Sequence, residues 1–227
     1  MSQILIRLDS IAPFITLLLL LPKYMKYEKS VQRKLRFIIL FLIIQFVLNF
    51  GATLVEVFIV NFDIVLMSNN YILHALNTIL SFIVIIILLS HILQVISKKA
   101  GNILMVVFLI LFIVSAILGD GIHSFNSYSA AFASLTIIFL CFLFFYQVLK
   151  GTNKKNTETP DTPLFWCVSG IFTYYFGSFF IFLTYQYLIS SSYRGLSFLW
   201  SLHNILLLIC CLYMIWGIIW KNYQQTY

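Results

Sequence analysis

Hydrophobic residues form long stretches in this chain, and polar residues gather in the gaps between them. Seven apolar stretches can be delimited, at residues 11–25, 37–60, 71–96, 103–118, 130–148, 165–188 and 199–220. A hydrocarbon core about 30 Å thick requires roughly 20 apolar residues in a helix, and most of these stretches approach or exceed that length. Helices also pair every backbone N–H and C=O group internally, as hydrocarbon demands. The pattern therefore predicts an all-α bundle of seven transmembrane helices, forming a single integral-membrane domain over residues 1–227.

Lys and Arg side chains are confined almost entirely to alternate gaps. Twelve of the fourteen lie in the first, third and fifth gaps or after the last stretch, with Lys23 at the end of the first stretch counted in the first gap, and Arg7 and Arg194 are the two that do not. Short cytoplasmic loops of membrane proteins collect Lys and Arg, so this distribution predicts an N-terminus outside and a C-terminus in the cytoplasm. The net charge of +7 then reflects topology, and we expect no nucleic-acid partner.

The first stretch is short and contains Pro13. We expect a retained helix here rather than a cleaved signal peptide, because the residues at 20–23 lack a small-residue cleavage site and Asp9 interrupts the preceding positive region. The four cysteines lie inside apolar stretches and lack the spacing of a disulfide framework or zinc site. No cofactor is expected from these features.

Polar side chains within the stretches are the candidates for function, because ionisable groups at membrane depth are costly and usually face a bundle interior. Gln45, Asn49 and Glu56 share one helix face at about 100° per residue. If the polar faces of three helices converge, they form an outward-facing pocket for a small ligand. Its predicted residues are Glu56, His74, Asn77, His203 and Asn204. Plain hydrogen bonding between helices, worth about 0.6 kcal/mol per contact, is the alternative explanation.

Two other functions remain as alternatives, a zinc-dependent hydrolase and a small-solute transporter. A zinc hydrolase needs three protein ligands and an open position, which His74, His203 and either Glu56 or Asp120 could supply. The His-x-x-x-His pair of seven-helix ceramidase-like enzymes is missing, however. A small-solute transporter with parallel repeats would place prolines at matching positions, and Pro13 has no counterpart in the fifth stretch. We therefore expect a protein that is not an enzyme.

A retinal protein can be excluded, because it requires a lysine in the middle of the last stretch and Lys221 lies at its inner end. The sixth stretch instead carries small residues at helical spacing, Gly170, Thr173 and Gly177. Small residues let helix backbones approach closely in a membrane, so these three predict a packing face.

The second half of the chain resembles a known family. The run Pro163-Leu-Phe-Trp-Cys-Val-Ser-Gly-Ile-Phe-Thr-Tyr-Tyr-Phe-Gly-Ser-Phe-Phe-Ile-Phe182, followed by Leu199-Trp-Ser-Leu-His-Asn-Ile205, is similar to small bacterial seven-helix membrane modules that occur alone or ahead of histidine-kinase domains. The resemblance covers about residues 126–221. The residues that carry it are Phe165, Trp166, Gly170, Tyr174, Gly177, His203 and Asn204.

This resemblance implies a sensor or receptor-like input module in the bacterial cell (inner) membrane. The printed sequence contains no kinase domain, so we expect any signal to pass to a separate membrane or cytoplasmic protein. The expected partners are thus the lipid bilayer and a signalling protein. The sequence leaves the oligomeric state open, a homo-oligomer included.

Overall fold

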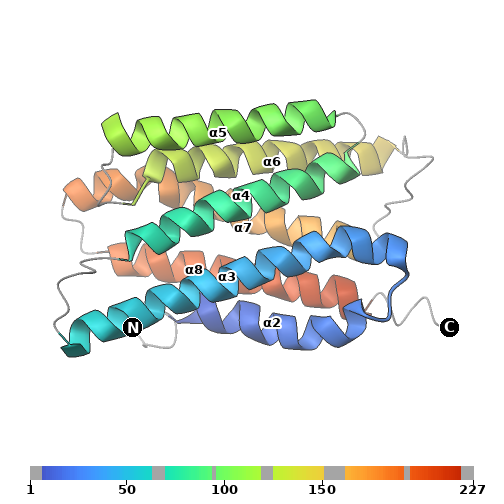
Figure 1. Ribbon diagram of the computed structural model, residues 1–227, viewed down its shortest axis with the longest axis horizontal. Helices are drawn as coiled ribbons and strands as arrows, with labels where there is room; N and C mark the ends of the chain where they lie inside the picture. The colour runs from blue at the N-terminus through green and yellow to red at the C-terminus, as the bar shows by residue number, and fades with distance from the viewer. Residues whose placement is uncertain are drawn as a thin grey trace.

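The computed structural model describes residues 7–62, 70–93, 96–118, 125–150, 162–191 and 195–220, except for the side chains of residues 57–62, 190 and 220. These residues form seven α-helices and one short π-helix, and none of them lies in a strand. The elements are α2 (Leu8–Tyr24), α3 (Lys29–Phe62), α4 (Tyr71–Ile92), α5 (Lys98–Leu118), α6 (Ser127–Lys150), α7 (Pro163–Ser190), α8 (Leu196–Ile215) and η2 (Trp216–Trp220). Figure 1 shows the helices lying lengthwise beside one another. The predicted all-helical architecture is confirmed.

Several helices extend beyond the apolar stretches. α3 begins at Lys29 instead of residue 37, and α5 begins at Lys98 instead of residue 103. Lys, Arg and Gln are good helix formers, so the helical backbone continues out of the apolar region. The basic segment from Lys29 to Arg36 is therefore the first part of α3, and the connection between α2 and α3 is short.

Six of the described helices, α3 to α8, are long and apolar enough to cross a membrane. α2 has 17 residues and contains Pro13 and Pro22. At 1.5 Å per residue it extends about 25 Å, which is shorter than a typical hydrocarbon core. The chain is thus a multi-pass membrane protein, and the seventh crossing stays a prediction.

Six helices form a closed ring in the order α2, α3, α4, α6, α7 and α8, each packed against the next and α8 against α2. α5 lies outside this ring, against α4 and α6, at the edge of the bundle in Figure 1. The two fully enclosed residues of α5 are Gly101 and Phe108, and the Phe108 ring lies 4.1 Å from that of Phe82 on α4. Most of the apolar surface of α5 is therefore left to lipid.

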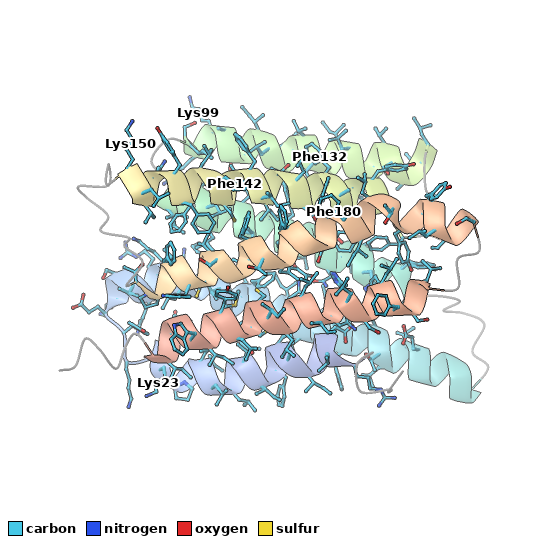
Figure 2. The ribbon with its side chains drawn as sticks, turned by 180° about the vertical axis from the view of Figure 1, so that it is seen from behind. Lys23, Lys99, Phe132, Phe142, Lys150 and Phe180 are labelled. Atoms are coloured by element: carbon cyan, nitrogen blue, oxygen red, sulfur yellow. The ribbon has the colours of Figure 1, made fainter. Side chains whose placement is uncertain are left out.

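Large apolar side chains also cover the outside of the ring. Phe142 on α6 and Phe180 on α7 are exposed, and Figure 2 shows both among the side chains that surround the ribbon. A soluble monomer rarely exposes so continuous an apolar surface. Contact with the hydrocarbon of a bilayer accounts for it.

One end of the bundle carries the basic residues. Figure 2 shows Lys23, Lys99 and Lys150, which belong to three different helix ends, at the same end of the molecule. Near this end the Tyr27 hydroxyl donates a hydrogen bond to the carbonyl oxygen of Ile218, over 2.9 Å. Burial raises the pKa of Tyr27 to about 12, so the hydroxyl keeps the proton that it donates. The turn after α2 is thereby tied to η2.

Glycines bring α7 and α8 close together. A Cβ atom added at Gly170 would lie 2.9 Å from the carbonyl oxygen of Cys210, and one added at Gly177 would lie 2.5 Å from Leu206 Cδ1. The hydroxyl of Thr173 donates to the carbonyl oxygen of Ser169 in its own helix, over 2.9 Å. The two glycines thus lie at the interface with α8.

Candidate functional site

A polar cavity lies inside the helix ring, and all six ring helices contribute side chains to its wall. About 40 Å³ is open to the centres of water-sized molecules. One water needs roughly 10–15 Å³ on this measure, so the cavity has room for about three waters. Its wall includes residues from the first turns of α2, α4 and α8, namely Asp9, His74 and Trp200. These turns lie at the end of the bundle opposite the lysines.

One side of the cavity is an amide cluster contributed by α3 and α4. The Nε2 atom of Gln45 donates to Asn77 Oδ1 over 3.0 Å and to Ser81 Oγ over 2.9 Å. The Nδ2 atom of Asn77 donates back to Gln45 Oε1 over 3.3 Å and to Asn49 Oδ1 over 3.1 Å. Gln45, Asn49 and Ser81 are buried. The polar stripe on α3 therefore faces α4 and holds the two helices in register.

A proline in α2 explains a further hydrogen bond of this cluster. Pro13 has no N–H group, so the carbonyl oxygen of Asp9, four residues earlier, lacks its usual helical donor. Asn49 Nδ2 on α3 donates to this oxygen over 3.1 Å and supplies the missing partner. The break in the backbone pairing of α2 thus links α2 to the amide cluster.

The carboxylate of Asp9 lies in the wall of the same cavity. Its residue is only 8% exposed, and within the described part of the chain its Oδ1 atom has no hydrogen-bond partner. Buried polar atoms in proteins are almost always paired, so this unpaired oxygen is costly to the fold. It is enclosed by protein and is not itself open to the cavity, although Asp9 is one of the residues that line it.

The opposite side of the cavity contains a histidine with both ring nitrogens paired. The Tyr174 hydroxyl lies 3.1 Å from His203 Nε2, and the Ser178 hydroxyl lies 2.8 Å from His203 Nδ1. Tyr174 and Ser178 are four residues apart, so they share one face of α7. These two hydrogen bonds from α7 fix the orientation of the His203 ring on α8 and hold it against α7.

Aromatic rings line the cavity beside the first turns of α4 and α8, around Trp200. The Trp200 ring contacts the rings of His74, His203 and Phe125, with centroids 5.3, 5.2 and 6.2 Å apart. Phe182 lies 5.1 Å from His203 and 5.4 Å from Phe125. This part of the wall is therefore a cluster of ring faces and edges around Trp200.

The predicted pocket residues are only partly brought together. His74, Asn77 and His203 line the cavity, whereas Glu56 does not and instead accepts a hydrogen bond from Asn70 Nδ2. Asn204 is fully buried but is not among the lining residues, because it is rotated by about 100° from His203 around α8.

Of the residues predicted to hold a metal, His74 and His203 line the same cavity, but Glu56 does not. Asp120 lies outside the described residues. Among the residues that are described, no group of three His, Cys, Asp or Glu side chains is close enough to hold a metal ion. His203 would have to give up a bond to Tyr174 or Ser178 in order to bind one.

Sequence reasoning overlooked several residues of the site, among them Asp9, Tyr174 and Ser178. For Asp9 the available signal is Pro13 four residues later, which leaves a carbonyl group that another helix must satisfy. Tyr174 and Ser178 had a weaker signal, namely two hydroxyls at helical spacing in an apolar stretch. Their common partner on α8 is visible only in the folded bundle.

Comparisons with known proteins add no further constraint. The resemblance to kinase-associated membrane modules therefore stays a prediction that depends on the residues quoted for it. No protein-family model, no curated protein and no solved structure matches this chain.

Proposed function

We propose that this protein is a receptor-like or accessory membrane module that binds a small polar ligand in the ring cavity and signals to a separate partner. The observation that carries the proposal is the cavity itself, which Asp9, His74, Asn77 and His203 line. Protein interiors are close-packed, so an open space beside several polar side chains is suited to hold water or a polar ligand.

The ring provides a route from ligand to signal. Side chains from all six ring helices line the cavity, so a ligand there lies among residues of every ring helix. A ligand shifts a conformational equilibrium by the difference between its affinities for the two states. Small changes in helix packing around the cavity would then reach the basic end, where a membrane or cytoplasmic signalling protein can respond.

The intrinsic fluorescence of Trp200 can report whether a ligand occupies the cavity. We expect the intrinsic fluorescence of the purified protein to change in a saturable way with at least one small polar probe, tested as methylammonium, acetamide and acetate. Trp200→Phe should abolish the change, because Trp200 lines the cavity. Trp166→Phe is the matched control and should retain it, because Trp166 packs against Tyr213 and Gly217 away from the cavity. No response to any probe would contradict the proposal.

We also propose that α2 is a seventh crossing, with the N-terminus outside and the C-terminus in the cytoplasm of a bacterial cell. The lysines at one end of the bundle support this orientation, since basic residues favour the cytoplasmic side. Reporter fusions should report opposite compartments for the two termini. Fusions that report the same compartment would show an even number of crossings, with α2 lying in the interface.

Transport of a small solute is the second candidate, because the cavity lies within a helix ring rather than on a lipid-facing surface. A receptor binds its ligand without moving it across the bilayer. Uptake of labelled methylammonium into proteoliposomes would separate the two functions: accumulation above that of empty liposomes identifies a transporter.

A further inference from the structure

The charge balance of the cavity wall indicates the kind of ligand that it takes. Asp9 contributes a carboxylate, and among the described residues that line the cavity none is Lys or Arg. A buried carboxylate without a compensating charge is costly. Asp9 nevertheless lines the cavity and is more than nine-tenths buried. Its carboxyl group avoids that cost either by keeping its proton or by lying close to a cation, and a cation in the cavity would supply the second.

The neighbouring oxygens argue against a hard metal cation. Calcium takes six to eight oxygen ligands, and magnesium demands near-octahedral coordination. The amide oxygens of Gln45, Asn49 and Asn77 already accept hydrogen bonds from one another or from Ser81. A dehydrated metal ion would have to break this cluster in order to be coordinated.

The remaining wall favours a cation that carries N–H groups. Aromatic faces attract ammonium groups within about 6 Å of the ring centroid. The wall contains the rings of Phe125, Tyr174, Tyr175, Phe182 and Trp200. A small cation in the cavity could balance the charge of Asp9 while it lies against these rings, and the amide cluster would remain intact.

The cavity also limits the size of the ligand. Its volume of about 40 Å³ corresponds to about three water-sized groups. From these observations, and on the basis of the proposed ligand-binding function, we infer that the cavity binds a small ammonium-type cation of about one to three non-hydrogen atoms, with Asp9 as its counter-ion. Ammonium and methylammonium satisfy this description, whereas tetramethylammonium is too large.

Binding of radiolabelled methylammonium to the purified full chain, measured by scintillation proximity, tests the inference. We expect saturable binding that ammonium chloride displaces. Equal concentrations of sodium chloride or tetramethylammonium chloride should not displace it. Asp9→Asn should weaken binding about tenfold or more, because it removes the negative charge that balances the cation.

Glu56→Gln is the matched control. Glu56 is a second carboxylate towards the same end of the bundle, but it pairs with Asn70 and does not line the cavity. This variant should bind methylammonium as the parent does. Equal weakening by Asp9→Asn and Glu56→Gln would overturn the inference, because a general surface charge effect would then explain both.

A second variant covers the case in which Asp9→Asn does not fold, as judged by gel filtration. Trp200→Leu removes a ring from the cavity wall and should weaken methylammonium binding about threefold or more. Unchanged affinity in a folded Asp9→Asn or Trp200→Leu protein would overturn the inference.

The inference and the proposed function fail in different ways. If acetamide or acetate changes Trp200 fluorescence while methylammonium shows no saturable binding, the cation inference is wrong and the proposed function stands. If no probe binds by either measurement, both are wrong. Displacement of methylammonium by sodium chloride would also contradict the inference, because it would show screening instead of a specific cation site.

Discussion

Gln45→Met is expected to lower the free energy of unfolding by about 1–3 kcal/mol, the cost of leaving buried polar groups without partners. Methionine keeps the length of the side chain but removes the hydrogen bonds that Gln45 makes with Asn77, Ser81 and Asn49. Asn49 and Asn77 retain their bond to each other, so the cluster loses its centre but not all of its pairing. Unfolding in mixed detergent micelles, followed by circular dichroism, measures the change.

Gln147→Met is the matched control for this prediction. Gln147 is 6% exposed, comparable with the 2% of Gln45, yet within the described ranges neither polar atom of its side chain has a hydrogen-bond partner. The same substitution should therefore leave stability unchanged or raise it. If the two variants were equally destabilised, the effect would come from the change of shape, and the amide cluster would contribute nothing of its own.

Gly170→Ala should destabilise the contact between α7 and α8 by about 1–3 kcal/mol, as is typical of overpacking. The added methyl group would meet the carbonyl oxygen of Cys210 at 2.9 Å and Tyr213 Cβ at 2.9 Å. A backbone oxygen cannot rotate away, so the two helices must separate. The loss is measured by the same detergent titration, and it should exceed the gain of about 0.5–1 kcal/mol from replacing a helical glycine.

Alanine substitutions at two other glycines serve as controls for that result. Gly51→Ala on α3 would bring its methyl group no closer than 3.6 Å to Leu73, which is an ordinary contact, so this variant should be neutral or more stable. Gly177→Ala meets the end of the Leu206 side chain, which can change its rotamer, and its cost should lie between the other two. A Gly170→Ala protein as stable as Gly51→Ala would show that α7 and α8 are not packed as closely as described.

The helix α5 can cross a membrane although it does not belong to the ring. Its hydropathy makes it one of the six helices that can cross a membrane, but it contributes no described residue to the cavity. Asn126 ties it to α6, because Nδ2 donates to the carbonyl oxygen of Phe112 and Oδ1 accepts from Ser115 Oγ. Changes on its lipid face should therefore leave ligand binding intact.

Much of the fold follows from the one-dimensional pattern. Long apolar stretches, each able to pair its backbone groups internally as a helix, predict a helical multi-pass protein, and six helices meet the requirement for crossing. Helix ends are less well determined, since α3 starts at Lys29 within a basic segment. A helix need not end where charged residues begin, because its backbone N–H and C=O groups remain hydrogen-bonded to one another in water.

The candidate site, too, could be predicted from the sequence only in part. His74, Asn77 and His203 were identified from their polarity in apolar stretches, and all three line the cavity. Glu56 has the same polarity on the same helix face as Gln45 and Asn49, yet it bonds to Asn70 beyond the cavity. Polarity identifies groups that need partners, but it does not say which partner is within reach.

The sequence by itself determined that this protein is helical, that it lies in a membrane, and that its basic residues gather at one side, because burial in hydrocarbon and attraction to the cytoplasmic face act on each segment separately. Only the tertiary structure decided that α5 stands outside the ring and that Asp9 lies in the cavity wall. Both depend on which helices pack together. All six helices that can cross a membrane are apolar overall, so hydropathy carries little information about which of them are neighbours.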